Sequence, residues 1–380
     1  MALDALKHTT NAKGYTEAHA ALKELMEGGD APAPHFDSVW VEATQKQASI
    51  LKDLYEQDLL VARATQCKDG IRNCHAQLAN LCVEQGDYTG ALKYVSKSRE
   101  HCPDNKSIFS TCMAIIRLNA LLQQYGSIQS FASKAQHSPY KDKDETVQAS
   151  QSKISAAYGL FYLTSGKYKD AAQSFAQVKQ TDLGTSLNDV LCAHDVALYG
   201  VLCGLASLDR GDIQKTLLEA SSFRECLDLV PHIRELALDF CNFKYAACLS
   251  ALERLKESLL MDVHLHEQVN ELCCQIRSKG MVQYFAPFKS VSLHSMAEAF
   301  NTDVDGIQGE VAQLIGKRQL DAKIDSQKKI LHARHANQRR STYQNALRVS
   351  QEFVDTTQAL ILRMNLLKHD FGVHYVRGKK

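Results

Sequence analysis

The 380-residue chain lacks several features that would place a protein in a membrane or outside the cell. No apolar run approaches the roughly 20 residues that a membrane-spanning helix needs. The opening residues, MALDALKHTT, contain no apolar core of the kind found in signal peptides. The 12 cysteines are scattered without a CxxC pair, which argues against a disulfide framework. These absences predict a reduced intracellular protein without a membrane anchor.

The chain also has little proline and almost no charge excess. A net charge of +1 gives no global attraction to nucleic acid or to a membrane surface. The 6 prolines and 19 glycines leave room for long helices, and strand patterns of period two are absent before Leu320. An apolar content of 45% is that of a globular protein. With 380 residues, the chain is long enough for two domains or one extended array. A mainly helical globular protein is therefore expected.

Recurring glycines indicate a helical repeat. Their spacings are 40, 40 and 45 residues, at Gly86, Gly126, Gly166 and Gly211. Each lies between two apolar helical patterns, so we expect each to take the left-handed conformation that ends a helix. A period near 40 residues with paired helices is typical of tetratricopeptide- or HEAT-like solenoids. The predicted fold class is all-α, with a helical-repeat solenoid over residues 1–225.

The stretch 281–334 changes its period and predicts a winged helix. Apolar residues at helical spacing over 293–300 and over 304–315 predict two helices separated at Asn301. A period of two then begins at Leu320 and predicts a strand, followed by a polar turn and a second short strand over 330–334. Helix, helix, strand, wing, strand is the order of a winged helix.

A last helix, from about residue 341 to 368, carries an apolar seam. The predicted members of the seam are Phe353, Leu360, Met364, Leu367 and Phe371. When Thr357 is included, consecutive members are alternately four and three residues apart. This spacing is close to that of a coiled coil, and the seam is too apolar to face water on a free monomer. We expect residues 341–380 to form an assembly helix. The alternative is that the seam folds back on the winged helix of its own chain.

The wing strands are expected to leave an unpaired edge. Such an edge can extend the sheet of a neighbouring subunit through backbone hydrogen bonds. The predicted interface residues at this edge are Ala322, Ile324, Ile330 and His332. The wing and the last helix are thus the two predicted protein-contact surfaces.

A basic stretch gives the strongest argument for another class, a winged-helix regulator that binds nucleic acid. No acidic residue lies between Asp325 and Glu352, and this is the one strong local charge bias expected in the chain. Such a regulator would place its second helix in the major groove. Here that helix carries Asp303, Asp305 and Glu310, which would face phosphate. Protein contact is therefore the favoured interpretation.

The best metal candidate is His264-Leu-His266 together with Cys273-Cys274. Four such ligands could hold zinc. However, residues one or two positions apart on a helix point to different sides, so one face would offer two ligands at most. No phosphate-binding glycine loop and no nucleophile elbow occurs. We expect no metal, no cofactor and no catalytic residue, against the alternative of a stand-alone metallohydrolase.

Several short motifs resemble the PCI-domain family, which takes its name from the proteasome lid, the signalosome and a translation initiation factor. The motifs of the domain itself are Tyr284-Phe-x-Pro, Met296-Ala-x-Ala-Phe, Leu314-Ile, Ala322-x-Ile-Asp and Lys329-Ile-Leu. Further motifs resemble the branch that supplies the first subunit of the COP-nine signalosome, namely Trp40-Val-Glu-Ala-Thr, Gly86-Asp-Tyr and Ala299-Phe-Asn-Thr. The resemblance spans nearly the whole chain. It implies a PCI domain over 226–340, with its winged helix at about 285–335.

The resemblance also implies a function. Signalosome subunits of this kind are non-catalytic scaffolds in the cytoplasm and nucleus, within a complex that removes the ubiquitin-like modifier Nedd from cullins. The implied partners are the second and third PCI subunits, the metalloisopeptidase subunit and cullin–RING ubiquitin ligases. The catalytic subunit of that complex uses His-x-His followed ten residues later by Asp, but here the tenth residue after His266 is Ile276. The alternative within the family is a proteasome-lid subunit.

Overall fold

The computed structural model describes most of the chain as two compact units. Unit 1 is Met1–Gly280 and unit 2 is Met281–Lys380. The division falls inside helix α16 (Val269–Phe285). The three-part division drawn from the sequence stays a prediction. The described residues are 6–7, 9–26, 35–137, 144–183, 187, 189–334 and 338–368.

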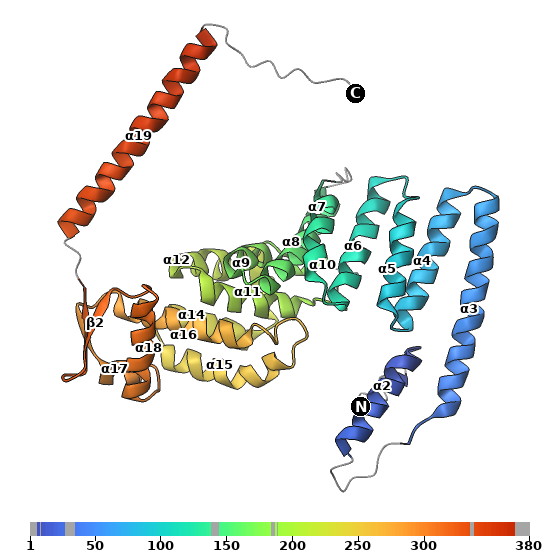
Figure 1. Cartoon of the computed structure of the whole chain (residues 1–380), viewed down its shortest axis with the longest axis horizontal. Coiled ribbons are helices and arrows are strands. Elements are labelled where there is room, and N and C mark those ends of the chain that lie inside the picture. The colour runs from blue at the N-terminus through green and yellow to red at the C-terminus, as the bar shows by residue number, and fades with distance from the viewer. Residues whose placement is uncertain are drawn as a thin grey trace. The chain divides into compact units, whose positions relative to one another are not determined.

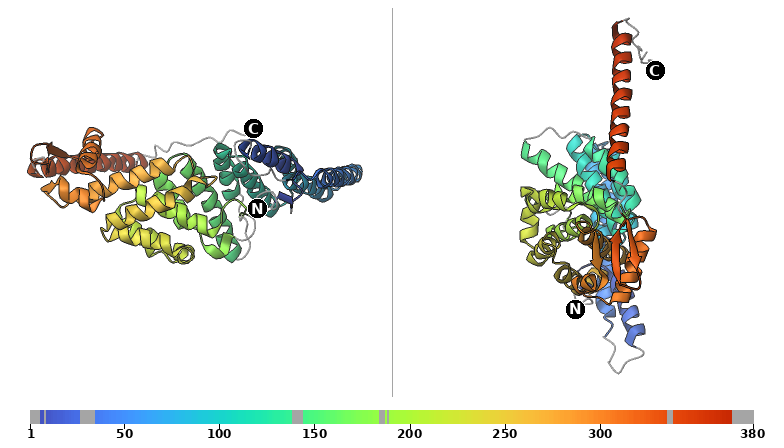
Figure 2. Two further views of the ribbon diagram at one scale, coloured as in Figure 1. Left: turned by 90° about the horizontal axis from the view of Figure 1, so that it is seen from below. Right: turned by 90° about the vertical axis from the view of Figure 1, so that its left-hand side faces the viewer.

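The elements described in unit 1 are all helices. They are α2 (Ala12–Met26), α3 (Ser38–Ala64), α4 (Lys68–Glu84), α5 (Tyr88–Arg99), α6 (Asn105–Leu121), α7 (Tyr125–Gln136), α8 (Asp144–Thr164), α9 (Tyr168–Ala176), α10 (Gln180–Leu183), α11 (Ala193–Ser207), α12 (Arg210–Ile213), the π-helical turn η1 (Gln214–Leu218), α13 (Ser221–Asp228), α14 (Pro231–Cys241) and α15 (Tyr245–Leu260). From α3 to α8 each helix packs chiefly against its neighbours in sequence (Figures 1 and 2). Burial against sequence neighbours is the defining feature of a solenoid, so this part of the fold prediction is confirmed.

One turn geometry joins helices at five places among the described residues of unit 1. In each turn a residue has a positive φ, and the next amide bonds to the carbonyl five residues earlier. The amide of Asp87, for example, donates to the carbonyl of Cys82 at 2.9 Å. This is the Schellman arrangement, which satisfies carbonyls at the end of a helix. The positive-φ residues are Gln66, Gly86, Gln123, Gly166 and Phe243.

The repeat glycines occupy these turns at only two of the four predicted positions. Gly86 (φ 77°) and Gly166 (φ 73°) have the expected left-handed conformation. The prediction is wrong for Gly126 and Gly211, which lie inside α7 and α12. The turn before α7 is instead made by Gln123 (φ 57°). Because glutamine tolerates this conformation at a modest cost, the spacing of glycines does not give the spacing of turns.

Alanine substitutions should separate a turn glycine from a helix glycine by their sign. A Cβ at Gly86 would lie 2.5 Å from Nδ2 of Asn11 and would need a positive φ, so Gly86→Ala should destabilise by about 1–2 kcal/mol. A Cβ at Gly126 meets nothing within 4 Å, so Gly126→Ala should stabilise by about 0.5–1 kcal/mol. Urea unfolding measures both. Effects of the same sign would contradict the assignment of the two positions.

The middle of unit 1 is packed so closely that glycine is required at two helix crossings. A Cβ at Gly159 of α8 would lie 2.5 Å from the Phe175 ring of α9. A Cβ at Gly200 of α11 would lie 2.7 Å from the Phe223 ring of α13. Phe175 is fully buried, and its ring meets that of Tyr199 edge-on with centroids 6.1 Å apart. Four helices therefore share one core around Phe175.

Unit 2 contains the predicted winged helix and the long last helix. Its elements after α16 are β1 (Ser290–Ser292), α17 (Leu293–Ala299), α18 (Val304–Gly316), β2 (Ala322–Asp325), β3 (Ile330–Ala333) and α19 (Gln338–Lys368). The winged-helix order is confirmed, but β1 was not predicted from the sequence. This strand has three residues with serine on both sides of Val291, too few to show a period of two. The core of the winged helix is made of the buried residues Val291, Leu293, Met296, Phe300, Ile307, Val311, Leu314, Leu320 and Leu331.

Candidate assembly surfaces

The sheet of the winged helix has β3 at its centre. Its order is β1–β3–β2 with antiparallel pairing, and Leu331 lies opposite both Val291 and Ile324. The predicted edge residues Ile330 and His332 are on this central strand, so their placement at an open edge was wrong. The cause is the missed strand β1, which covers the second side of β3. An interface role for these two side chains stays a prediction.

The open edges among the described strands belong to β1 and β2. The amide of Arg334 donates to the carbonyl of Asp321 at 2.9 Å, which fixes the phase of the β2–β3 ladder. Successive residues of an antiparallel strand direct their backbone groups to opposite sides. The N–H and C=O groups of Ala322 and Ile324 therefore point away from β3, toward the open edge. Ala322 and Ile324 are thus on an edge strand, and an interface role for them stays a prediction.

The exposed face of α18 is poorly suited to reading DNA. Lys329, in the turn of the wing, donates from Nζ to Asp305 at 3.0 Å and to Gln308 at 2.7 Å. A basic side chain of the wing is thus paired with the helix that would enter a major groove. The exposed positions of α18 include Gly306 and Gly309, and the helix itself carries no lysine or arginine. This face has no basic side chain to contact phosphates, and of its two glutamines Gln308 is already paired with Lys329.

Helix α19 presents the predicted apolar seam to solvent. Phe353 is 70% exposed and Leu367 is 68% exposed, with Leu360 and Met364 similar. The last predicted member of the seam, Phe371, lies outside the described residues. Side chains of this size are rarely left exposed in a row on a monomer. The four described seam residues therefore form a surface suited to a partner helix.

The seam begins ten residues before Phe353, the first member predicted from the sequence. Tyr343, which is 64% exposed, continues the alternating steps of three and four through Ala346 and Ser350 to Phe353. Because Ala346 and Ser350 are small, the apolar pattern fades there and the heptad is hard to see. The full register could have been found by extending the spacing backwards from Phe353.

The metal candidate His264 is engaged in structural hydrogen bonds. Its Nδ1 lies 2.8 Å from the hydroxyl of Tyr125, and its Nε2 lies 3.1 Å from the carbonyl of Val190. Burial lowers the pKa of His264, which favours the neutral ring. The neighbouring Asp262 accepts hydrogen bonds from the Tyr199 hydroxyl at 2.7 and 2.8 Å. Both ring nitrogens thus hold helices and loops together.

Comparison with protein-family models matches the two halves of the chain separately. Residues 245–335 match the PCI domain, and residues 37–216 match the 26S proteasome subunit RPN7. The first match covers the winged helix, and the second covers much of the solenoid. Both agree with the family resemblance of the short motifs.

Comparison with curated proteins is more specific. The chain is 39% identical to COP9 signalosome complex subunit 1 of Arabidopsis thaliana, over 90% of this chain and 76% of that protein. This chain belongs to the COP9 signalosome subunit 1 family. Other members are subunit 1 of Emericella nidulans, 34% identical over 97% of this chain and 76% of its own length, and subunit 1b of Drosophila melanogaster, 33% identical over 89% and 64%.

Membership of the signalosome family indicates that the exposed surfaces of unit 2 belong to a subunit of a larger complex. The chain is a PCI-domain subunit of the signalosome, and the RPN7 match records the relationship of this family to the proteasome lid. None of the described helices is both long and apolar enough to cross a bilayer. A signalosome subunit has neighbouring subunits to contact, and a role of α19 and the β2 edge in such contacts stays a prediction.

Proposed function

We propose that this chain is a non-catalytic scaffold of a signalosome-like complex that removes Nedd from cullins and so regulates cullin–RING ubiquitin ligases. Its direct partners are the second and third PCI subunits. The metalloisopeptidase subunit of the same complex carries out the cleavage. The complex acts on cullin–RING ligases in the cytoplasm and nucleus.

The single observation that carries this proposal is the exposed seam of α19. Burying one side chain of this kind stabilises an interface by about 1.5–3 kcal/mol. Four described seam residues can therefore supply the core of a helix bundle. The opposite side is polar in the first half of the helix, where Arg348 pairs with Glu352 at 2.8 Å, but it also carries the exposed Leu362. The apolar surface of α19 therefore extends beyond the seam, as expected where a helix meets more than one partner helix in a bundle.

A scaffold role without catalysis is supported by the residues around the His-x-His motif. Both ring nitrogens of His264 are held by Tyr125 and Val190. The position that would carry a metal-binding acid is occupied by Ile276, which is buried. The motif therefore serves the fold of unit 1, and the cleavage chemistry is assigned to another subunit.

The function is tested by purifying the tagged chain from its own cells and identifying its partners by mass spectrometry. We expect the other signalosome subunits to co-purify, and the mixture to release Nedd from a modified cullin. The chain purified alone should release none, because it supplies no catalytic group. Cleavage by the chain alone would contradict the scaffold role, and co-purification of proteasome-lid subunits only would favour the lid instead.

We further propose that the open edge of β2 extends the sheet of a neighbouring PCI subunit. The outward N–H and C=O groups of Ala322 and Ile324 are the donors and acceptors that strand addition uses. The strand is short and carries a charged side chain at Lys323, which limits non-specific pairing. A partner strand would add only backbone bonds at this edge, with the winged-helix core unchanged.

Ile324→Pro should disrupt this pairing while preserving the ladder to β3. Proline removes the outward N–H of residue 324, whereas Ile324→Ala shortens the side chain and keeps the N–H. We expect co-elution with the neighbouring PCI subunit to be lost for the proline variant and kept for the alanine variant. Proline at Ile330 would not serve, because that residue pairs with both neighbouring strands. Equal co-elution of the two Ile324 variants would end the edge proposal.

A further inference from the structure

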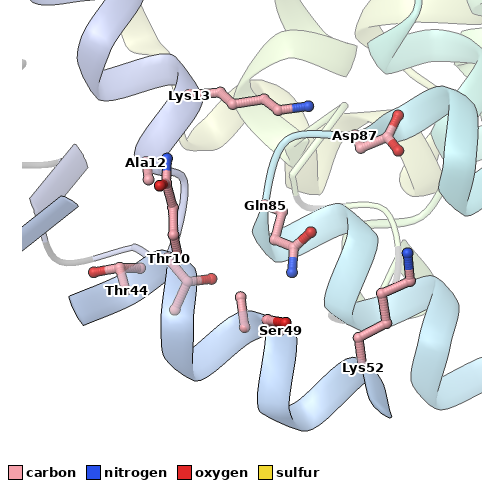
Figure 3. A pocket seen from close by; sticks show the side chains of 10 residues that line it. Thr10, Ala12, Lys13, Thr44, Ser49, Lys52, Gln85 and Asp87 are labelled. Carbon is pink, nitrogen blue, oxygen red and sulfur yellow. The ribbon is translucent and has the colours of Figure 1, made fainter. Parts of the chain in front are cut away.

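A groove in unit 1 is lined by lysines and contains a single carboxylate. Two adjoining cavities of about 430 and 280 Å³ lie among α2, α3, α4 and α5, and both are lined by Lys52, Gln85 and Asp87. Figure 3 shows Lys13 and Lys52 extending toward Gln85 and Asp87 at the α4–α5 turn. The lysines of the combined lining are Lys13, Lys52, Lys93 and Lys97.

The carboxylate of the lining is committed to the fold. Asp87 caps α5, where it accepts hydrogen bonds from the Gly90 amide at 3.0 Å and the Thr89 hydroxyl at 2.8 Å. The pKa of Asp87 is lowered chiefly by the hydrogen bond from the Gly90 amide and, to a smaller extent, by that from the Thr89 hydroxyl. Lys52 and Lys93 form no hydrogen bond or ion pair with any other described residue. Four lysines against one carboxylate leave the groove with a net positive charge.

Among the helices that line the groove, α3 and α4 carry both acidic and basic residues, whereas α5 and the two helices that follow it are only basic. α5, α6 and α7 contain no aspartate or glutamate. Lys97 lies 5.8 Å from the ring centroid of Tyr94, and Lys134 lies 4.7 Å from that of Phe131. Contact with an aromatic face holds a cation without neutralising it. Residues 105–141 contain no acidic residue, so the expectation that the only strong charge bias follows Asp325 is corrected.

Besides lysines, the groove is lined by apolar and neutral polar side chains. Its floor is apolar, with Leu78 and Leu81 buried and Tyr94 half-buried. Its walls carry the neutral polar side chains of Ser49 and Gln85. A small anion would use the lysines alone, whereas an extended peptide would use the cations, the floor and the walls together. Apolar side chains would cover the floor, and the peptide backbone would bond to the amide and hydroxyl groups.

We infer that this groove binds an extended segment of a partner protein in which acidic side chains alternate with apolar ones. Successive side chains of an extended segment point to opposite sides, which separates the acidic contacts from the apolar ones. The groove belongs to unit 1, whereas β2 and α19 belong to unit 2. The inference is therefore independent of the proposed assembly surfaces, and the test below uses the isolated full chain.

The test titrates the chain against a short fluorescein-labelled peptide in which aspartate alternates with leucine, read by fluorescence anisotropy. We expect Lys52→Glu with Lys93→Glu to weaken binding by about tenfold or more, since two attractive charges become repulsive. The matched control reverses two exposed lysines elsewhere in unit 1, Lys169→Glu with Lys215→Glu, and should change binding less than about twofold. Lys52→Gln with Lys93→Gln gives an uncharged version should the reversed variant fail to fold.

Two results would overturn the inference. Equal weakening in the groove and control variants would mean that the peptide responds to net charge alone. Displacement of the peptide by pyrophosphate, at concentrations that match the peptide itself, would mean that the groove is a small-anion site. A peptide with lysine in place of aspartate should not bind. The titration uses the isolated chain, so its result does not depend on whether the chain assembles into a signalosome. A failure of the proposed scaffold function and a failure of this inference can therefore be told apart.

Discussion

Replacing Leu360 and Met364 of α19 with aspartate should abolish incorporation of the chain into the signalosome while leaving its own folding intact. The two side chains are 60% and 61% exposed, so their loss removes little packing within the chain. In an assembled bundle the same positions would bury two carboxylates without partners, at a cost of several kcal/mol. Reconstitution with the second and third subunits, followed by size-exclusion chromatography, measures the loss.

The matched control places the same two charges on the polar side of α19. Gln344 and Gln358 are exposed and lie fourteen residues, or two heptads, apart on one stripe away from the seam. Gln344→Asp with Gln358→Asp should assemble normally. If the seam instead packs on the winged helix of its own chain, Leu360→Asp with Met364→Asp should lower the melting temperature by several degrees. That result, together with retained assembly, would contradict the bundle proposal.

Phe175→Ala should be among the most destabilising single substitutions in unit 1, at about 3–5 kcal/mol. Phe175 is fully buried, its ring fills the space that Gly159 leaves between α8 and α9, and its Cβ lies 3.3 Å from where a Cβ at Gly200 would be. Neither glycine has a side chain that could move into the cavity, so little relaxation is expected. Urea denaturation followed by circular dichroism measures the change.

The same substitution on α19 provides the comparison. Phe353 is 70% exposed, so Phe353→Ala should change the stability of the isolated chain by no more than about 0.5 kcal/mol. It should weaken assembly, since it removes a seam residue. Phe175→Ala at a temperature where the chain remains folded should leave assembly unchanged. Similar losses of stability for both variants would mean that Phe353 packs inside its own chain.

The sequence was most informative where a period ran for several turns. The helices around Met296 and Val311 and the seam through Leu360 are visible because apolar residues recur at helical spacing. β1 was missed because three residues cannot establish a period. That single omission also misplaced Ile330 and His332, since the position of a strand in a sheet depends on all of its neighbours.

Contacts between distant residues could not be predicted from spacing. The hydrogen bond from Tyr125 to His264 joins residues 139 positions apart, and that from Tyr199 to Asp262 joins residues 63 apart. A His-x-His motif has the same appearance whether it binds a metal or closes a loop. The lysine groove is similar, because Lys13, Lys52 and Lys93 converge only when α2, α3 and α5 pack together.

The central position of β3 leaves the sheet with two unlike edges, one on β1 and one on β2. If β1 accepts a neighbouring strand as we propose for β2, a subunit of this kind is bivalent, with a different neighbour at each edge. Contacts between unlike surfaces are heterologous, and such contacts propagate head to tail until a ring closes or an end subunit blocks them. A complex of finite size made in this way needs either closure or terminal members whose outer edge is covered. The order of subunits in the row is then set by which edges match.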